Sequence, residues 1–172
     1  MEIARINVDL IKSGHRQIHL GLTNKEGEMQ IMWVTTPDSY NTPVVHYGRF
    51  PSQLNHHAYA VISTYNVGHL GFRGSIYKAV LENLEPNKRY YYKVGDQHTK
   101  TFSAIKHFNG PPRKGQQLDE INIAVFGDMG TFAPLGHLVM NQIVRDNLVK
   151  PADFVFLTGD IAYAGMNKEE DG

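Results

Sequence analysis

Short runs of alternating hydrophobic and polar positions fill the chain from Gln17 to Ser103. These runs are rich in Val, Ile, Tyr and Thr, and turn-forming segments such as NKEG, TPDSYNTP and LEPNK separate them. A period of two residues is typical of half-buried strands. We predict seven of them, at Gln17–Thr23, Glu28–Thr35, Val44–Arg49, Ala58–Tyr65, Ser75–Asn83, Tyr90–Val94 and Thr99–Ser103. Seven short strands with regular turns indicate an antiparallel β-sandwich.

The segment Leu84–Tyr90 strengthens the sandwich prediction. A Leu-x-Pro turn is followed by Tyr90 at the start of the next predicted strand. This pattern is typical of a tyrosine corner, in which the phenol hydrogen-bonds to the backbone a few residues upstream. Trp33 is the only tryptophan and is expected in the core. We interpret the other strand aromatics, Tyr47, Tyr77, Tyr90 and Tyr92, as core packing rather than ligand stacking.

The pattern changes after a polar segment rich in Pro and Gly, residues 103–120. Ile121–Phe126 and Phe154–Thr158 are continuous apolar runs, as expected of strands that are covered on both faces. Between them, Leu135, Leu138, Val139, Gln142, Ile143 and Leu148 recur at helical spacing, and Pro151 follows. Strand, helix and strand at this length predict a βαβ unit with parallel strands. The predicted organisation is a sandwich at 1–112, a linker at 113–120 and an incomplete α/β domain at 121–172.

Composition excludes several classes of function. The 172 residues carry a formal net charge of zero, so no basic field favours nucleic acid or a membrane surface. There is no cysteine, so neither a disulfide nor a thiolate can form. The first residues, MEIARINVDLIKSG, lack the apolar core of a signal peptide, and no run approaches the length of a membrane span.

Each predicted parallel strand ends in a Gly-Asp step, Gly127-Asp128 and Gly159-Asp160. In an open α/β sheet the carboxyl ends of the strands form the functional crevice, and neighbouring strands lie ~5 Å apart. Two carboxylates this close repel each other unless a cation lies between them or one takes up a proton. A single Asp at such a position often only caps the next helix, but two of them favour a metal site. The P-loop and dinucleotide-binding signatures are absent from the sequence.

Tyr163 lies three residues after Asp160, where a tight turn brings its phenol back toward the same ion. A phenol has an ordinary pKa of ~10 and is a poor ligand for Zn²⁺ or Mg²⁺ at neutral pH. A strongly Lewis-acidic trivalent iron can deprotonate it, and hard oxygen donors suit such an ion. The alternative is a tyrosine that merely closes the turn.

These residues resemble the motifs of the purple acid phosphatases, the binuclear-metal branch of the metallophosphoesterases. GDMG (127–130) is similar to the family's Gly-Asp-x-Gly motif, and GDIAY (159–163) to its Gly-Asp-x-x-Tyr motif. Three segments of the sandwich, RQIHLGLTNKEGEMQIMWVT, VVHYG and SIYKAVLENLEPNKRYYYKVGD, resemble the fibronectin-III-like domain of the large members. The implied fold is a fibronectin-III-like sandwich followed by the first βαβ unit of a metallophosphoesterase domain.

The resemblance implies an acid phosphatase that hydrolyses small phosphate monoesters. Asp128 and Tyr163 would bind Fe(III), and Asp160 would bridge to a second divalent ion, Fe, Zn or Mn. No nucleic-acid or membrane partner is expected, and a homodimer of the full-length form is compatible with the family. The family is usually secreted, vacuolar or lysosomal, although no signal peptide is visible here.

Three further family motifs, Gly-Asn-His-(Asp/Glu), a His after a Val-x-x pattern and Gly-His-x-His, have no counterpart in the 172 residues. His137 follows a glycine but is interpreted as a surface or packing residue. No catalytic residue is therefore predicted within this chain, and its own activity is expected to be absent. The alternative hypothesis is a non-catalytic remnant whose sandwich acts as an interaction module.

Overall fold

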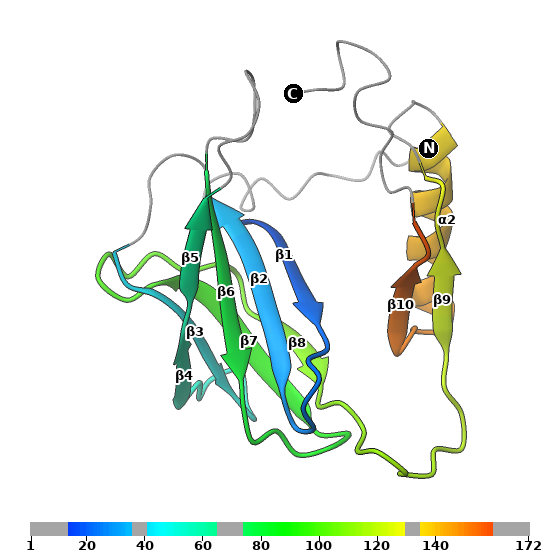
Figure 1. Ribbon diagram of the computed structural model, residues 1–172, viewed down its shortest axis with the longest axis horizontal. Coiled ribbons are helices and arrows are strands. Elements are labelled where there is room, and N and C mark those ends of the chain that lie inside the picture. Colours follow the sequence, from blue (N-terminus) through cyan, green and yellow to red (C-terminus); the bar gives the residue numbers. More distant parts are fainter. Residues whose placement is uncertain (1–13, 36–40, 65–73, 130–134, 160–172) are drawn as a thin grey trace. The chain divides into compact units, whose positions relative to one another are not determined.

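The computed structural model describes residues 14–35, 41–64, 74–129 and 135–159 (Figure 1). The chain divides into two compact units, Met1–Gln116 and Gln117–Gly172. Within the described residues the structure is mostly β-sheet with a single helix. None of the helical residues described forms a segment long and apolar enough to cross a membrane.

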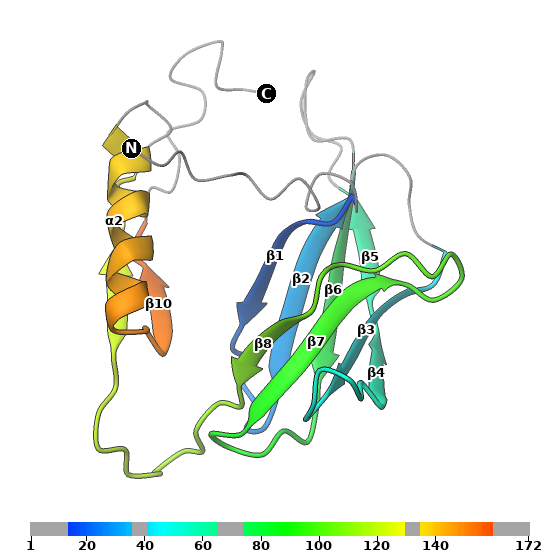
Figure 2. The same ribbon diagram turned by 180° about the vertical axis from the view of Figure 1, so that it is seen from behind.

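The first unit is a sandwich of two antiparallel four-stranded sheets, which face each other in both views (Figures 1 and 2). One sheet has the order β1-β2-β6-β5, with bounds Arg16–Gly21, Met29–Thr35, Ser75–Leu81 and Val61–Thr64. The other has the order β4-β3-β7-β8, with bounds His56–Tyr59, Pro43–Gly48, Arg89–Asp96 and Lys106–Asn109. The sandwich prediction is confirmed.

Alternating side chains of the central strands build the core between the two sheets. In β2 every second residue is buried from Met29 to Thr35, and β6 repeats the pattern from Ser75 to Leu81. Trp33 is fully buried and stacks on Tyr77 with ring centroids 5.1 Å apart. Tyr90 and Tyr92 are also buried, whereas Tyr47 packs against the core only in part. The predicted role of the strand aromatics is therefore confirmed.

The predicted tyrosine corner is present. The hydroxyl of Tyr90 accepts a hydrogen bond of 3.0 Å from the backbone N–H of Glu85. Leu84 is buried beneath the turn, and its N–H donates to the carbonyl oxygen of Gly27 at 2.8 Å. The corner thus ties the turn at Glu85 to β7, the strand that contains Tyr90.

The single strand predicted at Ala58–Tyr65 is wrong, because this run forms two strands in different sheets. β4 pairs with β3, whereas β5 pairs with β6. The break falls at Ala60, whose N–H donates to the carbonyl oxygen of Pro43 at 2.9 Å. The chain changes sheets at this point, so a run that is continuous in sequence serves both layers.

The strand predicted at Thr99–Ser103 is also wrong. Residues 97–99 form a turn, and Phe102 makes only an isolated bridge to Gly95. The last strand of the sandwich is β8, which lies within the polar segment 103–120. β8 pairs with β7 and buries Phe108, which stacks on Tyr90 at 5.7 Å. Directly after β8, the N–H of Gly110 donates to the carbonyl oxygen of Lys88 at 2.8 Å, which extends the pairing with the segment before β7.

The second unit contains β9 (Ile123–Phe126), α2 (Leu135–Val149) and β10 (Phe154–Leu157). β9 and β10 pair in parallel, and α2 lies on one face of the pair in both views (Figures 1 and 2). The predicted helix is confirmed, because α2 includes all the positions from Leu135 to Leu148 that recur at helical spacing. The expected cover on both faces of the strands is not found among the described residues, since Val125 is 61% and Phe156 is 54% exposed.

Candidate metal centre

The two Gly-Asp steps follow strands that are direct neighbours. β9 and β10 are parallel and in register, from the pair Ile123 with Phe154 to the pair Phe126 with Leu157. Their carboxyl ends therefore lie at the same edge of the two-stranded sheet. This arrangement is what the sequence pattern of two apolar runs around a helix predicts.

Backbone hydrogen bonds continue the pairing beyond the strands themselves. The N–H of Thr158 donates to the carbonyl oxygen of Phe126 at 2.9 Å, and the N–H of Asp128 donates to that of Gly159 at 3.2 Å. Asp128 is thus bonded to the residue that directly precedes Asp160. The two segments are joined side by side up to the point where the candidate ligands begin.

Glycine is required at position 127 by this close approach. A Cβ atom at Gly127 would lie 2.6 Å from Oγ1 of Thr158 and 2.9 Å from the carbonyl oxygen of Gly159. Contacts this short would push the strand ends apart. Gly159 itself has a φ of 134°, which side chains disfavour. The glycines therefore serve the backbone geometry that brings the two segments together.

Asp128 adopts a left-handed backbone conformation with a φ of 56° and has an exposed side chain. Asp tolerates this region better than most residues, and such outliers are concentrated at functional sites. Its carboxylate is open to solvent at the end of β9. Asp160 and Tyr163 lie outside the described residues, so their part in the predicted site stays a prediction.

The donor chemistry of this edge fits a hard cation, since Asp128 offers a solvent-accessible carboxylate where the two segments join. One described carboxylate does not make a complete site. Among residues 14–35, 41–64, 74–129 and 135–159, no three His, Asp or Glu side chains are grouped to hold a metal ion. Any metal at this edge must therefore take further ligands from residues outside that set.

Carboxylates at the opposite end of the strands have structural roles. Asp153 accepts a hydrogen bond of 2.9 Å from the N–H of Asn122 through its side chain, and its own N–H donates to the carbonyl oxygen of Asn122 at 2.8 Å. Glu120 pairs with Lys150, and hydrogen bonds from Lys150 and Asn122 hold the pKa of Glu120 below its ordinary value. These contacts tie the segments before β9 and β10 together.

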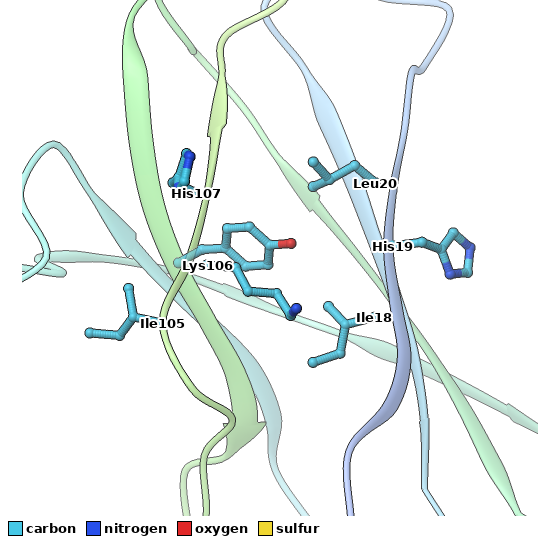
Figure 3. Close-up of a pocket in the computed structure, with 7 residues that line it drawn as sticks. Ile18, His19, Leu20, Ile105, Lys106 and His107 are labelled. Atoms are coloured by element: carbon cyan, nitrogen blue, oxygen red, sulfur yellow. The ribbon is translucent and has the colours of Figure 1, made fainter. Parts of the chain in front are cut away.

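A separate groove of about 470 Å³ lies between the edge strands β1 and β8 of the sandwich (Figure 3). The side chains of Ile18 and Lys106 point toward one another across it, whereas the His19 ring points away. Burial raises the pKa of Tyr92, which lines the groove, to about 12, so its phenol stays protonated. The groove is open and partly apolar, and its other titratable lining residues are His19, Lys106 and His107. The sequence does not predict this groove, because its two walls, β1 and β8, are the first and last strands of the sandwich along the chain.

Comparison with protein families identifies the sandwich. Residues 15–109 match the family described as "Purple acid Phosphatase, N-terminal domain". This match covers more than half of the chain and includes every strand from β1 to β8. The chain belongs to the purple acid phosphatase family.

Several curated proteins are similar over most of the chain. "Purple acid phosphatase 15" of Arabidopsis thaliana is 28% identical over 87% of this chain and 30% of its own length. "Probable purple acid phosphatase 20" of the same organism is 31% identical over 87% of this chain and 32% of its own length. "Probable inactive purple acid phosphatase 9", also from that plant, is 28% identical over 95% of this chain and 28% of its own length.

The fold agrees with a solved structure of a family member. The purple acid phosphatase PPD1 from seeds of yellow lupin, Lupinus luteus, superimposes with a TM-score of 0.70 and 24% sequence identity. The superposition covers 85% of this chain and 29% of the lupin chain. The chain therefore spans less than a third of the length of the relatives that it matches.

Proposed function

We propose that this chain forms the N-terminal part of a metal-dependent acid phosphatase that hydrolyses small phosphate monoesters. In this proposal β9, α2 and β10 are the first βαβ unit of a metallophosphoesterase domain. The observation that carries it is the hydrogen bond from the N–H of Asp128 to the carbonyl oxygen of Gly159. That bond supports a site in which the carboxylates of both Gly-Asp steps reach one point.

Asp128 and Tyr163 would hold Fe(III), and Asp160 would hold both that iron and a second divalent ion, Fe, Zn or Mn. The family generally uses a binuclear metal centre, which supplies Lewis acidity and positive charge to a bound phosphate. The carboxylates of this chain would balance the charge of the cations. The Tyr163 phenolate would add a hard oxygen donor, and Gly127 would keep the two donor segments within reach of one site.

The ligand set of this chain is partial in the proposal. The family's Asn and His motifs are absent from its sequence, so the remaining metal ligands and the general acid belong to the rest of the full-length protein. The 172 residues alone would then bind metal weakly and show no turnover, because aspartate and tyrosine oxygens from two strand ends leave most positions to water.

A second candidate is a non-catalytic protein whose sandwich binds a partner. It is favoured by the similarity, over 95% of the chain, to a relative named as a probable inactive purple acid phosphatase. The two candidates differ in whether the rest of the full-length protein contributes metal ligands. The presence of these ligands would support the phosphatase, and their absence would support the interaction module.

Metal analysis of the full-length protein separates the two candidates. Asp160→Asn is expected to lose both metals and the hydrolysis of p-nitrophenyl phosphate at acid pH. Asp128→Ala is expected to empty chiefly the iron site. Asp119→Asn, an exposed carboxylate before β9, is the matched control and should keep metals and activity. Wild-type metal content in both site variants would contradict the proposed centre, and a metal-free inactive wild type would favour the interaction module.

A further inference from the structure

The outer face of the sheet β4-β3-β7-β8 contains two histidines that lie directly opposite each other. His46 of β3 pairs with His57 of β4, while the preceding pair, Val45 with Ala58, faces the core. We propose that His46 and His57 form a two-histidine site for a transition-metal ion that prefers imidazole, such as Cu(II), Ni(II) or Zn(II). This site would consist only of residues of the sandwich and is independent of the proposed phosphatase centre.

The distance between the two rings allows one metal ion to bind a nitrogen of each. Directly paired residues of antiparallel strands have Cβ atoms ~4.5–5.5 Å apart and side chains on the same face. The His46 and His57 ring centroids are 6.4 Å apart with an interplanar angle of 39°. Two metal–nitrogen bonds of ~2.0–2.1 Å can span this separation once the facing nitrogens turn toward each other. His57 is exposed, so its ring has room to turn.

His46 already has the outer partner that orients a metal-binding imidazole. Its Nε2 lies 2.8 Å from Oε1 of Gln97. An amide oxygen only accepts, so Nε2 carries the hydrogen and the lone pair of Nδ1 remains available. The backbone N–H of Gln97 donates to the carbonyl oxygen of Thr42 at 2.9 Å, which holds Gln97 in place. Such second partners fix the tautomer and the ring orientation of metal ligands.

Neighbouring side chains set the kind of ion that fits. The rings of Phe102 and His46 are nearly perpendicular with centroids 5.1 Å apart, and those of Tyr59 and His57 are arranged alike with centroids 5.2 Å apart. Lys93 pairs with His46 from the β7 side, and its ammonium lies 4.3 Å from the Phe102 centroid. With neutral nitrogen donors and a nearby positive charge, the site disfavours Mg²⁺ and Ca²⁺, which need anionic oxygens. It favours ions that bind imidazole strongly, with solvent in the remaining positions.

Titration of the 172-residue protein with Cu(II) or Ni(II) alone tests the proposal by calorimetry and by the imidazole signals in the NMR spectrum. His57→Gln should weaken binding about tenfold or more, and binding should weaken as the pH falls, since protons compete for the nitrogens. His56→Gln is the matched control, because His56 is the exposed neighbour that points to the other side of β4. It should bind as the wild type does.

The emission of Trp33 during unfolding verifies that His57→Gln remains folded. Asp128→Ala should keep the calorimetric binding, which separates this site from the proposed phosphatase centre. The proposal is overturned if His57→Gln binds with wild-type affinity, or if His56→Gln loses affinity to the same extent.

Discussion

The hydroxyl of Tyr90 lies 3.0 Å from the backbone nitrogen of Glu85 and accepts its hydrogen. Tyr90 is buried, and the guanidinium of Arg49 lies 5.0 Å from its ring centroid. Tyr90→Phe keeps the ring and leaves the Glu85 N–H without its partner. We expect a loss of about 1–2 kcal/mol in the free energy of unfolding, as for a hydrogen bond at a partly buried site.

Urea unfolding followed by tryptophan emission measures this loss, because the only tryptophan, Trp33, is buried in the sandwich. Tyr59→Phe is the control, since Tyr59 is 60% exposed and its variant should unfold at the wild-type urea concentration. An unchanged midpoint in Tyr90→Phe would show that the corner does not stabilise the sandwich.

Asp96 is a second point at which the sandwich depends on one polar side chain. Burial alone would raise its pKa, but backbone N–H groups of Thr99, Thr42 and His98 hold the pKa below the ordinary value of 3.8. A lowered pKa in the folded state means that stability is present above pH 3.8 and is lost as the pH falls through the folded pKa. We expect the wild-type sandwich to lose stability steeply below this pH.

Asp96→Asn replaces the carboxylate with an amide, which places either its N–H₂ group or an uncharged, weaker hydrogen-bond acceptor against these donors. We expect the free energy of unfolding to fall by about 1–3 kcal/mol at neutral pH. The steep loss at low pH should also become smaller. Unfolding midpoints between pH 7 and pH 3 measure both effects, with the exposed Glu82→Gln as the control. Parallel pH profiles for wild type and Asp96→Asn would contradict this role.

His15 predicts a different pH window. Burial lowers its pKa from 6.5 to about 4, and the residue is 1% exposed. The unfolded state then binds more protons between these two values, so stability falls as the pH falls from 6.5 to 4. The linked loss is at most about 3 kcal/mol.

His15→Gln cannot take up a proton and should flatten the stability profile in this window. His19→Gln changes an exposed histidine of β1, four residues after His15, and should leave the profile unchanged. The same tryptophan emission serves as the measurement. A wild-type slope in His15→Gln would assign the acid sensitivity to other groups.

The two units are expected to differ when they are expressed alone. In the second unit, Val125, Phe156 and Leu148 are 61%, 54% and 80% exposed, and the described part of its sheet has two strands. Uncovered apolar side chains and open strand edges favour aggregation. Residues 118–172 should therefore be poorly folded, while residues 1–112 should be soluble. A cooperative thermal transition with dispersed amide signals from 118–172 would refute this prediction.

Local chemistry explains which parts of the fold were predictable. The tyrosine corner depends on a few adjacent residues, and Trp33 lies in a strand with strict alternation, so both follow from sequence. The break at Ala60 does not, because it depends on a hydrogen bond to Pro43 in another strand. β8 does not follow from the sequence either, because a four-residue strand with one buried aromatic gives almost no periodic signal.

Some features of the candidate site were likewise predictable from sequence, and others were not. Two apolar runs around a helix predicted neighbouring strand ends, and the bond from Asp128 to Gly159 agrees with that prediction. The contact between Gly127 and Thr158 was not predictable, since the register of the two strands decides it. The ligand roles of Asp160 and Tyr163 depend on side-chain positions that sequence spacing alone does not fix.

The visible spectrum of the metal-loaded full-length protein tests the proposed centre most directly. If Tyr163 binds Fe(III) as a phenolate, charge transfer from the phenolate to iron gives a purple to pink colour. Tyr163→Phe keeps the ring and removes only the oxygen, so the band should disappear and iron should be retained less firmly, with little change in unfolding. Tyr59→Phe should keep the colour. A visible band of equal strength in Tyr163→Phe, or no band in an iron-loaded wild type, would contradict the account.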